Sequence, residues 1–441
     1  MKNVLITGGA GFIGSHLALK LKSDGYKVTC FDSLSPQIHG ENPDTTSSTY
    51  NLIKNEVEFT QGDVRDRAAL AKALDKTDCV IHLAAETGTG QSMYDISKYC
   101  EVNIQGTAIL LEEVARRKSQ IKKVILASSR AVYGEGQYLC REHGNQYPDS
   151  RSDAAMKSKR FEHECRMCGQ VMDLVPTQEV SPTNPQSIYG ITKLTQEQLV
   201  LRASQSFNID AVALRFQNVY GPGQALSNPY TGILSIFSTR SRENKPIAIF
   251  EDGLESRDFV YIDDIVQSIY LSMKYQKPGQ HVFNVGSGVK TTVNEVVKEI
   301  VKFFKSDSLI TITGQYRIGD IRHNIADLNN ISLELGYKPT VYFEQGLQNF
   351  LSWILTQEKA QDGYEKSLEE LRSRGLLKKM KKRILLISSD FFKYYELISK
   401  ELENQGWVVT YMNDRPSTNP FMKIFIRKFR FLMTCYLNAY Y

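Results

Sequence analysis

The sequence predicts an α/β fold with a doubly wound parallel sheet, and three observations predict it. Short apolar runs alternate with helical stretches of ten or more residues in the first part of the chain. A glycine-rich turn joins the first apolar run to the first helical stretch, and several later runs end on small or acidic residues. Strands and helices that alternate in this way build a parallel sheet covered by helices.

The first strand is expected at Asn3–Thr7, a β-branched apolar run typical of a buried parallel strand. Gly8, Gly11 and Gly14 follow directly, and a helical pattern runs from Ser15 to Lys22. Glycines with this spacing permit a tight turn, the close approach of a pyrophosphate and close packing of helix on sheet. The start of the helix offers free N–H groups to the diphosphate. The pattern therefore predicts a Rossmann-type dinucleotide site.

The second strand, Tyr26–Phe31, ends at Asp32, which lies 18 residues beyond Gly14. An acidic residue at this distance is expected to meet the ribose hydroxyls of the adenosine. Its carboxylate repels a 2′-phosphate, so NAD is favoured over NADP. The alternative is a cluster of turn glycines followed by a chance aspartate.

Three further strands are expected at Glu58–Gln61, Cys79–Leu83 and Lys123–Ala127. The first leads to Asp63, whose carboxylate can accept a hydrogen bond from the adenine amino group. The second leads to two alanines, which are small enough for the backbone to pass beside a cofactor. The third leads to a pair of serines that ends with Ser129.

Tyr189 and Lys193 are spaced i and i+4, so on a helix both side chains face the same way. Lys193 is expected to hold the nicotinamide ribose and, through its charge, to lower the pKa of Tyr189. Tyr189 can then act as general base toward a sugar hydroxyl, and Ser129 can hydrogen-bond the same oxygen. An ordinary surface tyrosine and lysine would match this pattern too. The pair follows the glycine turn and the serine pair in the chain, and this order favours a role in the site.

A series of motifs occurs in one order along the chain: TGGAGFIG, Asp63, HLAA, SSRAVYG, YGITK, LRFQNVYGPG and RDFVYIDD. This series resembles the extended short-chain dehydrogenases/reductases of the nucleotide-sugar epimerase/dehydratase family, from residue 1 to about residue 350. Within that family, AAETGTGQSMY, SSRAVYGEG, YLCREHG and QNVYGPGQALSNPYTGILSIFSTR are most similar to dTDP-L-rhamnose 4-epimerases. Those enzymes interconvert dTDP-L-rhamnose and dTDP-6-deoxy-L-talose. The resemblance implies a nucleotide-sugar substrate, bound NAD and a homodimer.

Carried over by motif, the resemblance implies that Ser129, Tyr189 and Lys193 are catalytic, with Ser129 also touching substrate. The residues expected at NAD, besides Tyr189 and Lys193, are Gly8, Gly11, Phe12, Ile13, Asp32, Asp63, Val64, Leu83, Ala84 and Asn103. The resemblance also places Asn218, Arg257 and Arg317 at the substrate diphosphate. A planar guanidinium suits phosphate oxygens because it donates two parallel hydrogen bonds. The alternative for Arg257 is a surface ion pair with Asp258.

The residues after Ser129 bear on the type of reaction. Dehydratases of this family carry an Asp-Glu pair just after the catalytic hydroxyl, whereas Arg130 and Ala131 stand here. The resemblance therefore implies a 4-epimerase that works through a transient 4-keto sugar and bound NAD, in the synthesis of cell-surface polysaccharide precursors. The alternatives are an NAD(P)-dependent nucleotide-sugar dehydratase or reductase, and a non-catalytic sugar-nucleotide sensor.

An insertion at about residues 136–182 carries Cys140-x2-His143 and Cys165-x2-Cys168. Two ligand pairs with this spacing match a tetrahedral structural zinc site, and His163 is a candidate substitute ligand. The alternative is a loop with free thiols. His82, Cys30, Cys79 and Cys100 are expected to pack in or near the core.

The sequence predicts three parts. Residues 1–356 form the epimerase, in which a smaller α/β part that binds the sugar nucleotide follows the NAD-binding Rossmann core. Residues 357–379 form a helical tether, and residues 380–441 one β-α-β unit of an incomplete Rossmann-like extension. A single β-α-β unit is too small to bury its own core. The stretch Phe421–Tyr441 is expected to be a helix of that extension, or alternatively a basic amphipathic helix on a membrane surface.

The charge of the chain is uneven. Its 441 residues carry a net charge of +5, but residues 378–441 hold 12 Lys and Arg against 5 Asp and Glu. The remainder is slightly acidic, so no nucleic-acid partner is expected. No apolar stretch is long enough to span a bilayer. Because the N-terminus is interpreted as strand, turn and helix rather than a signal peptide, a cytoplasmic enzyme is expected, and its seven cysteines are not expected to form disulfides.

Overall fold

The computed structural model divides into two compact units, Met1–Lys378 and Lys379–Tyr441. It describes residues 1–226, 228, 232–358, 363–378, 383–388, 394–404 and 407–413. The first unit therefore contains all of the sequence motifs discussed above.

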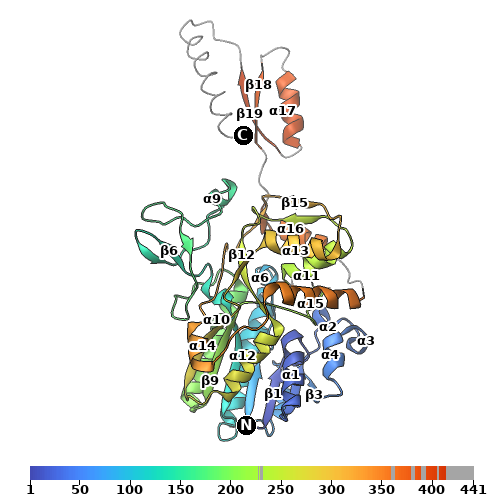
Figure 1. The fold of residues 1–441 in the computed structure, drawn as a ribbon, viewed down its shortest axis with the longest axis vertical. Coiled ribbons are helices and arrows are strands. Elements are labelled where there is room, and N and C mark those ends of the chain that lie inside the picture. Colours follow the sequence, from blue (N-terminus) through green and yellow to red (C-terminus); the bar gives the residue numbers. More distant parts are fainter. Residues whose placement is uncertain are drawn as a thin grey trace. The chain divides into compact units, whose positions relative to one another are not determined.

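A seven-stranded parallel sheet forms the centre of the first unit (Figure 1). Its strands are β1 (Asn3–Thr7), β2 (Lys27–Asp32), β3 (Glu58–Gln61), β4 (Cys79–His82), β5 (Lys123–Ser129), β9 (Asp210–Phe216) and β13 (Gln280–Val285). They lie in the order β13-β9-β5-β4-β1-β2-β3, and each neighbouring pair is parallel. The chain changes direction across the sheet between β1 and β4, which is where open sheets of this kind bind ligands. The predicted fold and the five predicted strands are confirmed.

Two apolar cores lie on opposite faces of this sheet. Val4 and Ile6 of β1 belong to one core and Leu5 to the other, because successive side chains of a strand point to opposite faces. The first core includes α1 (Phe12–Ser23) and α12 (Ile262–Lys274). The second includes α8 (Gly106–Arg116) and α10 (Ile188–Phe207). The helices on both faces leave the carboxyl ends of the strands open for a site.

Short helices connect the strands of the sheet. They are α2 (Pro36–His39), α3 (Pro43–Thr46), α4 (Ser48–Ile53), α5 (Arg67–Ala73), α6 (Thr89–Ser92), α7 (Ile96–Tyr99), the π-helix η1 (Cys100–Gln105) and the 3-10 helix η2 (Arg130–Tyr133). The core residues expected among these elements are in place. His82 is buried between the hydroxyls of Thr7 and Thr107, at 2.7 and 2.9 Å. The thiols of Cys30 and Cys79 are buried, and that of Cys100 is half-buried.

A smaller α/β part follows β9. Its elements are β10 (Asn218–Tyr220), α11 (Ile233–Arg242), β11 (Ile247–Ile249), β12 (Ser256–Tyr261), β14 (Lys290–Thr292), α13 (Val293–Phe304), β15 (Ile310–Ile312), β16 (Tyr316–Arg317), α14 (Asn329–Leu335) and α15 (Phe343–Thr356). β12 lies between β10 and β14, and β11 pairs with β15. Tyr220 joins this part to the first core through edge-on contacts with Phe259 and Phe350.

The cysteine-bearing insertion forms a small sheet of its own. β6 (Tyr138–Cys140) pairs antiparallel with β7 (Gly144–Gln146) on one side and with β8 (Asp173–Leu174) on the other. A short helix, α9 (Asp153–Lys157), lies between β7 and β8 in the chain.

The stretch expected as a tether packs against the first unit. α16 (Tyr364–Ser373) buries Tyr364, Leu368 and Leu371 next to Ile236 and Phe250. The following strand, β17 (Leu377–Lys378), pairs antiparallel with β16. The prediction of a tether at residues 357–379 is wrong for this part, because the apolar face of α16 has a partner on the smaller α/β part.

The second unit contains β18 (Arg383–Ser388), α17 (Tyr394–Asn404) and β19 (Val408–Asn413). β18 and β19 are parallel, so the predicted β-α-β unit is present. The prediction for Phe421–Tyr441 lies outside the described residues. Within the described ranges, no helix combines the length and apolar character that crossing a membrane requires.

Candidate active site

A cavity of 1220 Å³ opens at the carboxyl ends of the central strands. The residues that line it include Gly8, Gly11, Phe12, Ile13, Asp32, Asp63, Val64, Leu83, Ala84, Ser129, Tyr189 and Lys193. The structure thus brings together the residues expected at catalysis and at NAD, with the exception of Asn103.

The turn after β1 has room for backbone only. Gly8 has a φ of 72°, and a Cβ there would lie 2.8 Å from the backbone nitrogen of Ala84. A Cβ on Gly14 would lie 2.3 Å from the carbonyl oxygen of Gly8. Helix α1 begins after Gly11, and no side chain caps its first N–H groups. A diphosphate fits this cradle, since it can accept hydrogen bonds from those N–H groups.

Asp32 is held at the end of β2 by backbone hydrogen bonds. Its Oδ2 accepts from the Ala10 N–H at 3.0 Å, and its Oδ1 accepts from the Leu34 N–H at 2.9 Å. The carboxylate lines the cavity and has little freedom to turn away from it. A fixed negative charge at this place disfavours a 2′-phosphate.

Asp63 lines the same cavity but already has a partner. Its two carboxylate oxygens lie 3.0 Å from Nε and 2.7 Å from Nη2 of Arg65. The hydrogen bond from Arg65 is the main reason that the pKa of Asp63 is lowered. An adenine amino group would have to share this carboxylate with Arg65.

Tyr189 lies where β5 ends and α10 begins. Ser129 is the last residue of β5, and Ser187 caps α10 by accepting the Gly190 N–H at 3.1 Å. Burial raises the pKa of Tyr189, whereas a side-chain hydrogen bond with Ser129 and the charge of Arg130 act to lower it. The phenol is therefore held beside Ser129 at the wall of the cavity.

Lys193 does not lower the pKa of Tyr189, so that prediction is wrong. The Nζ atom of Lys193 donates to Oε1 of Gln196 at 2.7 Å, and the side chain is buried. Burial lowers the pKa of Lys193 to about 7, against the effect of Glu197. An ammonium group loses charge when it leaves water, so Lys193 has less charge to offer than the sequence pattern suggests.

Gln196 was not identified from the sequence, although it accepts a hydrogen bond from Lys193. Its Nε2 donates to the hydroxyl of Thr107 at 2.7 Å, and Thr107 also contacts His82 at 2.9 Å. Burial and the charge of Lys193 lower the pKa of His82 to about 3, so this histidine is neutral. The available signal was a glutamine three residues after Lys193, on the helix face that packs on the sheet.

Asn103 is not among the residues that line the cavity, and its expected place at NAD stays a prediction. The side chain is fully buried, and its Oδ1 accepts from the Glu86 N–H at 2.8 Å. Its Nδ2 donates to the hydroxyl of Thr192 at 3.0 Å. Through the hydroxyl of Thr192, Asn103 therefore fastens α10 beside Tyr189.

The residues expected at the substrate diphosphate lie outside the lining of this cavity. Arg257 donates to the carbonyl oxygens of Ile321 and Arg322, at 2.8 and 2.9 Å. Arg317 pairs with the carboxylate of Asp320, at 2.8 Å from both Nε and Nη2. The alternative of a surface ion pair between Arg257 and Asp258 is wrong. The carboxylate of Asp258 is buried and accepts hydrogen bonds from the backbone N–H groups of residues 287, 288 and 326.

The residue after Ser129 is a half-buried cation, Arg130. Nε of Arg130 donates to Oδ1 of Asn218 at 3.0 Å. Burial and the neighbouring charge of Arg257 lower the pKa of Arg130 to about 10, so it is protonated at neutral pH. A guanidinium at this position cannot serve as the acid that a dehydratase needs to eliminate water.

The predicted metal ligands of the insertion converge. Sγ of Cys140 lies 3.6 Å from Nδ1 of His143 and from Sγ of Cys168. Sγ of Cys165 lies 3.6 Å from the same Nδ1, and the four ligand atoms lie within 4.8 Å of one another.

A glycine with positive φ follows each of these ligand pairs. Gly144 has a φ of 68° and Gly169 a φ of 73°. The backbone therefore takes the same left-handed conformation directly after the second ligand of each pair. The expected substitute, His163, lies apart from the cluster, with its Nε2 3.1 Å from a carboxylate oxygen of Glu135.

The family comparison agrees with this geometry. The model of the NAD dependent epimerase/dehydratase family matches residues 4–156 and 165–286. The chain belongs to this family. A dTDP-L-rhamnose 4-epimerase of Burkholderia thailandensis is 34% identical over 356 residues, which are 80% of this chain and 95% of that protein. A putative UDP-glucose 4-epimerase of Methanocaldococcus jannaschii is 30% identical over 80% of this chain and 98% of its own length.

Solved structures of epimerases share the fold of this family member. A UDP-glucose 4-epimerase of Thermotoga maritima, with UDP-glucose, has a TM-score of 0.64 and 28% identity. It covers 80% of this chain and 98% of its own. A UDP-glucuronic acid 4-epimerase of Bacillus cereus, in complex with UDP-glucuronic acid and NAD, has a TM-score of 0.63 and 28% identity, over 80% and 99% of the two chains. The predicted class, an NAD-dependent nucleotide-sugar epimerase, is confirmed.

This epimerase-family chain departs from the family model in the insertion. The match stops at residue 156 and resumes at residue 165, within the cysteine-bearing segment. The unmatched residues include Glu162 and His163, and both make polar contacts with the body of the protein.

Proposed function

We propose that the protein is a nucleotide-sugar 4-epimerase with NAD in the cavity described above. The observation that carries the proposal is one cavity with Ser129, Tyr189 and Lys193 on its wall together with the glycine turn and Asp32. Arg130 stands where a dehydratase needs an acid, which favours epimerisation over loss of water.

The residues of the chain divide the chemistry between them. NAD, when bound, supplies the reversible two-electron oxidation of a ring hydroxyl. Tyr189 accepts the hydroxyl proton and later returns it, and Ser129 hydrogen-bonds the same oxygen. Lys193 would hold the nicotinamide ribose, and Asp32 would hold the adenosine ribose. The transient 4-keto sugar then takes hydrogen back on its other face.

We propose dTDP-L-rhamnose and dTDP-6-deoxy-L-talose as the substrate pair, as in the Burkholderia relative, which is named a dTDP-L-rhamnose 4-epimerase. The test is NMR of purified protein with dTDP-L-rhamnose and no added reductant. A 6-deoxy-talose spin system at equilibrium is expected. An unchanged spectrum would contradict this substrate, and UDP- and GDP-sugars would then be compared.

The same assay separates the alternatives. A dehydratase would leave dTDP-L-rhamnose unchanged, because this 6-deoxy sugar has no 6-hydroxyl to lose, but it would form a 4-keto-6-deoxy sugar from dTDP-D-glucose. A reductase would need added NADH or NADPH for each turnover. A sensor would bind the sugar nucleotide without converting it. An epimerase converts it to a fixed ratio of isomers with no net use of cofactor.

We propose that Cys140, His143, Cys165 and Cys168 hold a structural zinc ion. Three thiolates and one imidazole fill a tetrahedral shell, which leaves no open position for chemistry. Elemental analysis of the purified protein is expected to find one zinc ion per chain. The variant Cys165→Ser should lose the metal, while Cys100→Ser, at a thiol outside the cluster, should keep it. Absence of stoichiometric zinc from the unmodified protein would contradict the assignment.

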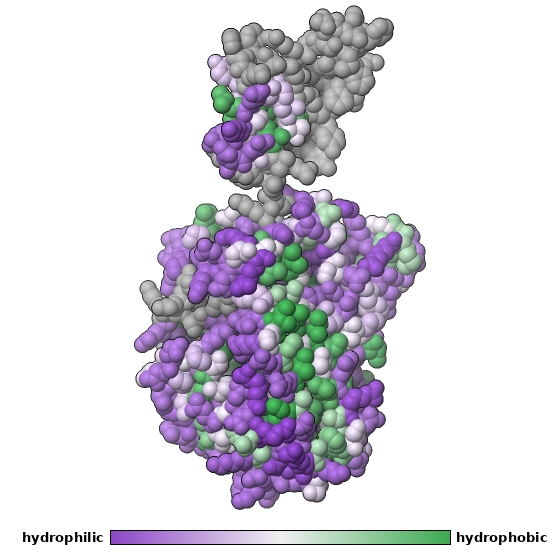
Figure 2. Space-filling model, turned by 180° about the vertical axis from the view of Figure 1, so that it is seen from behind, coloured by the Kyte–Doolittle hydropathy of each residue, from purple (hydrophilic) through white to green (hydrophobic). Residues whose placement is uncertain are grey.

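We further propose a homodimer, and a cytoplasmic location stays a prediction from the sequence. Figure 2 shows apolar residues gathered in a band on one face of the first unit. Ile96 and Ile191 are among the exposed apolar side chains, and Ile191 lies on α10. Light scattering is expected to give twice the chain mass, and a monomer mass would contradict the proposal.

A further inference from the structure

We propose that the cysteine-bearing insertion positions the two arginines expected at the substrate diphosphate, Arg257 and Arg317. It does so through residues 320–323, which contact both the insertion and the arginines. The inference rests on the proposed function, since it takes the diphosphate of a nucleotide sugar as the ligand. It makes the insertion a determinant of nucleotide-sugar affinity.

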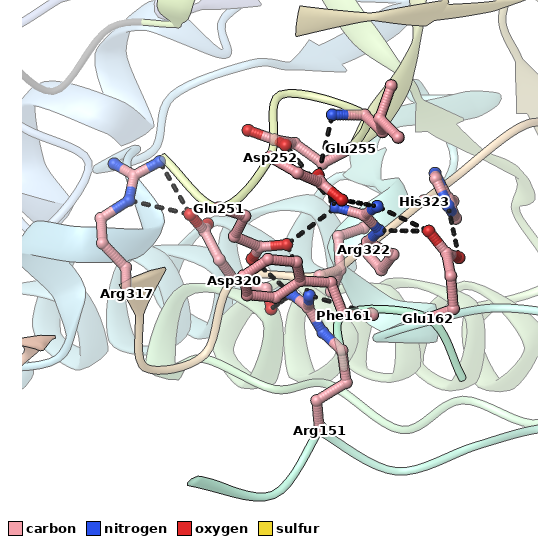
Figure 3. Close-up of polar contacts among 12 residues, drawn as sticks. Arg151, Phe161, Glu162, Glu251, Asp252, Glu255, Arg317, Asp320, Arg322 and His323 are labelled. Carbon is pink, nitrogen blue, oxygen red and sulfur yellow. Dashed lines mark hydrogen bonds and ion pairs between the residues drawn. The ribbon is translucent and has the colours of Figure 1, made fainter. Parts of the chain in front are cut away.

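Residues 320–322 orient both arginines. The Arg257 guanidinium donates to the carbonyl oxygens of Ile321 and Arg322, at 2.8 and 2.9 Å. The Arg317 guanidinium donates to Oδ2 of Asp320 at 2.8 Å (Figure 3). Because a guanidinium is planar, these contacts fix the direction in which its remaining N–H groups point.

Glu162 of the insertion holds this segment from one side. The Arg322 side chain is fully buried, and its Nε donates to Oε1 of Glu162 at 2.9 Å. The other oxygen of Glu162 lies 3.1 Å from Nε2 of His323. On its opposite side Arg322 donates to both oxygens of Asp252, at 2.7 and 2.9 Å, so that its guanidinium lies between the two carboxylates (Figure 3).

Arg151 of the insertion also contacts residues 320–323. It donates to both oxygens of Glu251, at 2.7 and 2.9 Å, and to the carbonyl oxygen of Asp320 at 3.1 Å. Arg151 and Glu251 are 4% and 5% exposed, so the pair is shielded from solvent. Two charged side chains of the insertion thus contact the same short segment.

The buried charges of Arg151, Glu251 and Arg322 are not explained by the stability that packing alone would need. Buried ion pairs are often no more stabilising than apolar side chains of the same volume. They differ from apolar contacts in direction, because each charge-assisted hydrogen bond fixes two atoms relative to each other. Directional contacts suit a segment that must hold two guanidinium groups in place.

The turn from Cys165 to Gln170 holds the segment that carries Glu162. Glu162 lies three residues before Cys165, whose N–H donates to the carbonyl oxygen of Gln170 at 2.8 Å. The Gly169 N–H closes the same turn on the carbonyl oxygen of Cys165 at 2.8 Å. The insertion therefore has a rigid turn next to the residue that contacts Arg322.

The test compares two glutamates of the insertion in the full-length protein. Glu162→Gln removes the charge that faces Arg322. Glu164→Gln is the matched control, because its carboxylate pairs with Arg160 at the surface, at 3.2 Å. Calorimetry with dTDP is expected to show a roughly tenfold weaker Kd for Glu162→Gln, as for one lost charge-assisted contact. Glu164→Gln should bind dTDP like the unmodified protein, and all three proteins should contain the same amount of NAD.

Arg257→Met separates failure of this inference from failure of the proposed site. If Arg257→Met weakens dTDP binding and Glu162→Gln does not, the insertion has no positioning role and the proposed function stands. If Arg257→Met binds dTDP like the unmodified protein, the diphosphate role of Arg257 is wrong and the inference falls with it. Should Glu162→Gln lose NAD or melt early, Arg151→Lys replaces it. That variant keeps the charge but loses the paired hydrogen bonds, and an unchanged dTDP affinity would overturn the inference.

Discussion

At the scale of single residues, the chemistry of Tyr189 depends on groups that its own helix does not supply. Ser129 comes from the end of β5, and Arg130 follows it in the chain. Both act to lower the pKa of Tyr189 against the effect of burial. The phenol is the group in this constellation that can exchange a proton with a sugar hydroxyl.

Tyr189→Phe removes the phenolic oxygen and leaves the ring in place. Turnover is expected to fall by roughly 10²- to 10⁴-fold, the usual effect of losing a general acid or base. Binding of dTDP should be nearly unchanged, because no contact with the diphosphate is assigned to this hydroxyl. NMR measures turnover and calorimetry measures binding. Turnover equal to that of the unmodified protein would remove Tyr189 from the mechanism.

Lys193 makes the stability of the protein depend on pH. Its pKa is lowered from 10.5 to about 7 in the folded protein. Between these values the unfolded chain keeps the proton and the folded protein has lost it, so the free energy of unfolding rises with pH. Relative to Lys193→Met, the unmodified protein without NAD should gain at most about 1.4 kcal/mol per pH unit above pH 7. Urea unfolding from pH 6 to 9 measures this, and a constant difference would contradict it.

At the scale of elements, helix α1 lies so close to the turn after β1 that position 14 has no room for a side chain. Gly14→Ala would place a Cβ 2.3 Å from the carbonyl oxygen of Gly8, so α1 must move away from the strand. The variant is expected to lose bound NAD, measured by cofactor release and calorimetry.

Gly25→Ala is the control for this change. Gly25 has a φ of 82° with no atom within 4 Å of an added Cβ, so it should lose about 1 kcal/mol of stability. It should keep NAD, because it lies beyond the far end of α1. Equal NAD content in Gly14→Ala and Gly25→Ala would contradict the proposed contact between the turn and the diphosphate.

The C-terminal elements of the first unit extend the part that carries Arg317. β17 pairs with β16, the strand that contains Arg317, and α16 covers Phe250 next to it. Phe250 also lies under the Arg317 guanidinium, at 5.3 Å from the ring centre. Residues 364–378 therefore belong to the support of the expected substrate site.

At the scale of the whole molecule, the cavity and its supports lie within Met1–Lys378. A chain that ends at residue 378 is expected to keep the turnover and the melting temperature of the first unit. A chain that ends at residue 356 should melt several degrees lower, because it loses the buried side chains of α16 and β17. Differential scanning calorimetry of the two chains measures this. Equal melting temperatures would contradict the packing of α16.

Much of the fold could be predicted from the sequence. Strand and helix periodicity depend on residues a few positions apart, so β1 to β5 were predicted at nearly their observed ends. The glycine turn, Asp32, Ser129 and Tyr189 follow directly from those elements. The carboxyl ends of parallel strands meet at one edge, which brings these residues to one cavity.

The partners of the remaining residues depend on segments far apart in the chain, and only the tertiary structure decides them. Asn103 contacts Thr192, Arg257 contacts Ile321, and α16 packs next to Ile236. The pKa of Lys193 is set by burial, which no spacing of residues reveals. The sequence by itself therefore determined the fold, the family resemblance and the meeting of Ser129, Tyr189 and Lys193 at one cavity. The tertiary structure decided which charges are paired and which are buried, because pairing and burial result from packing between distant segments.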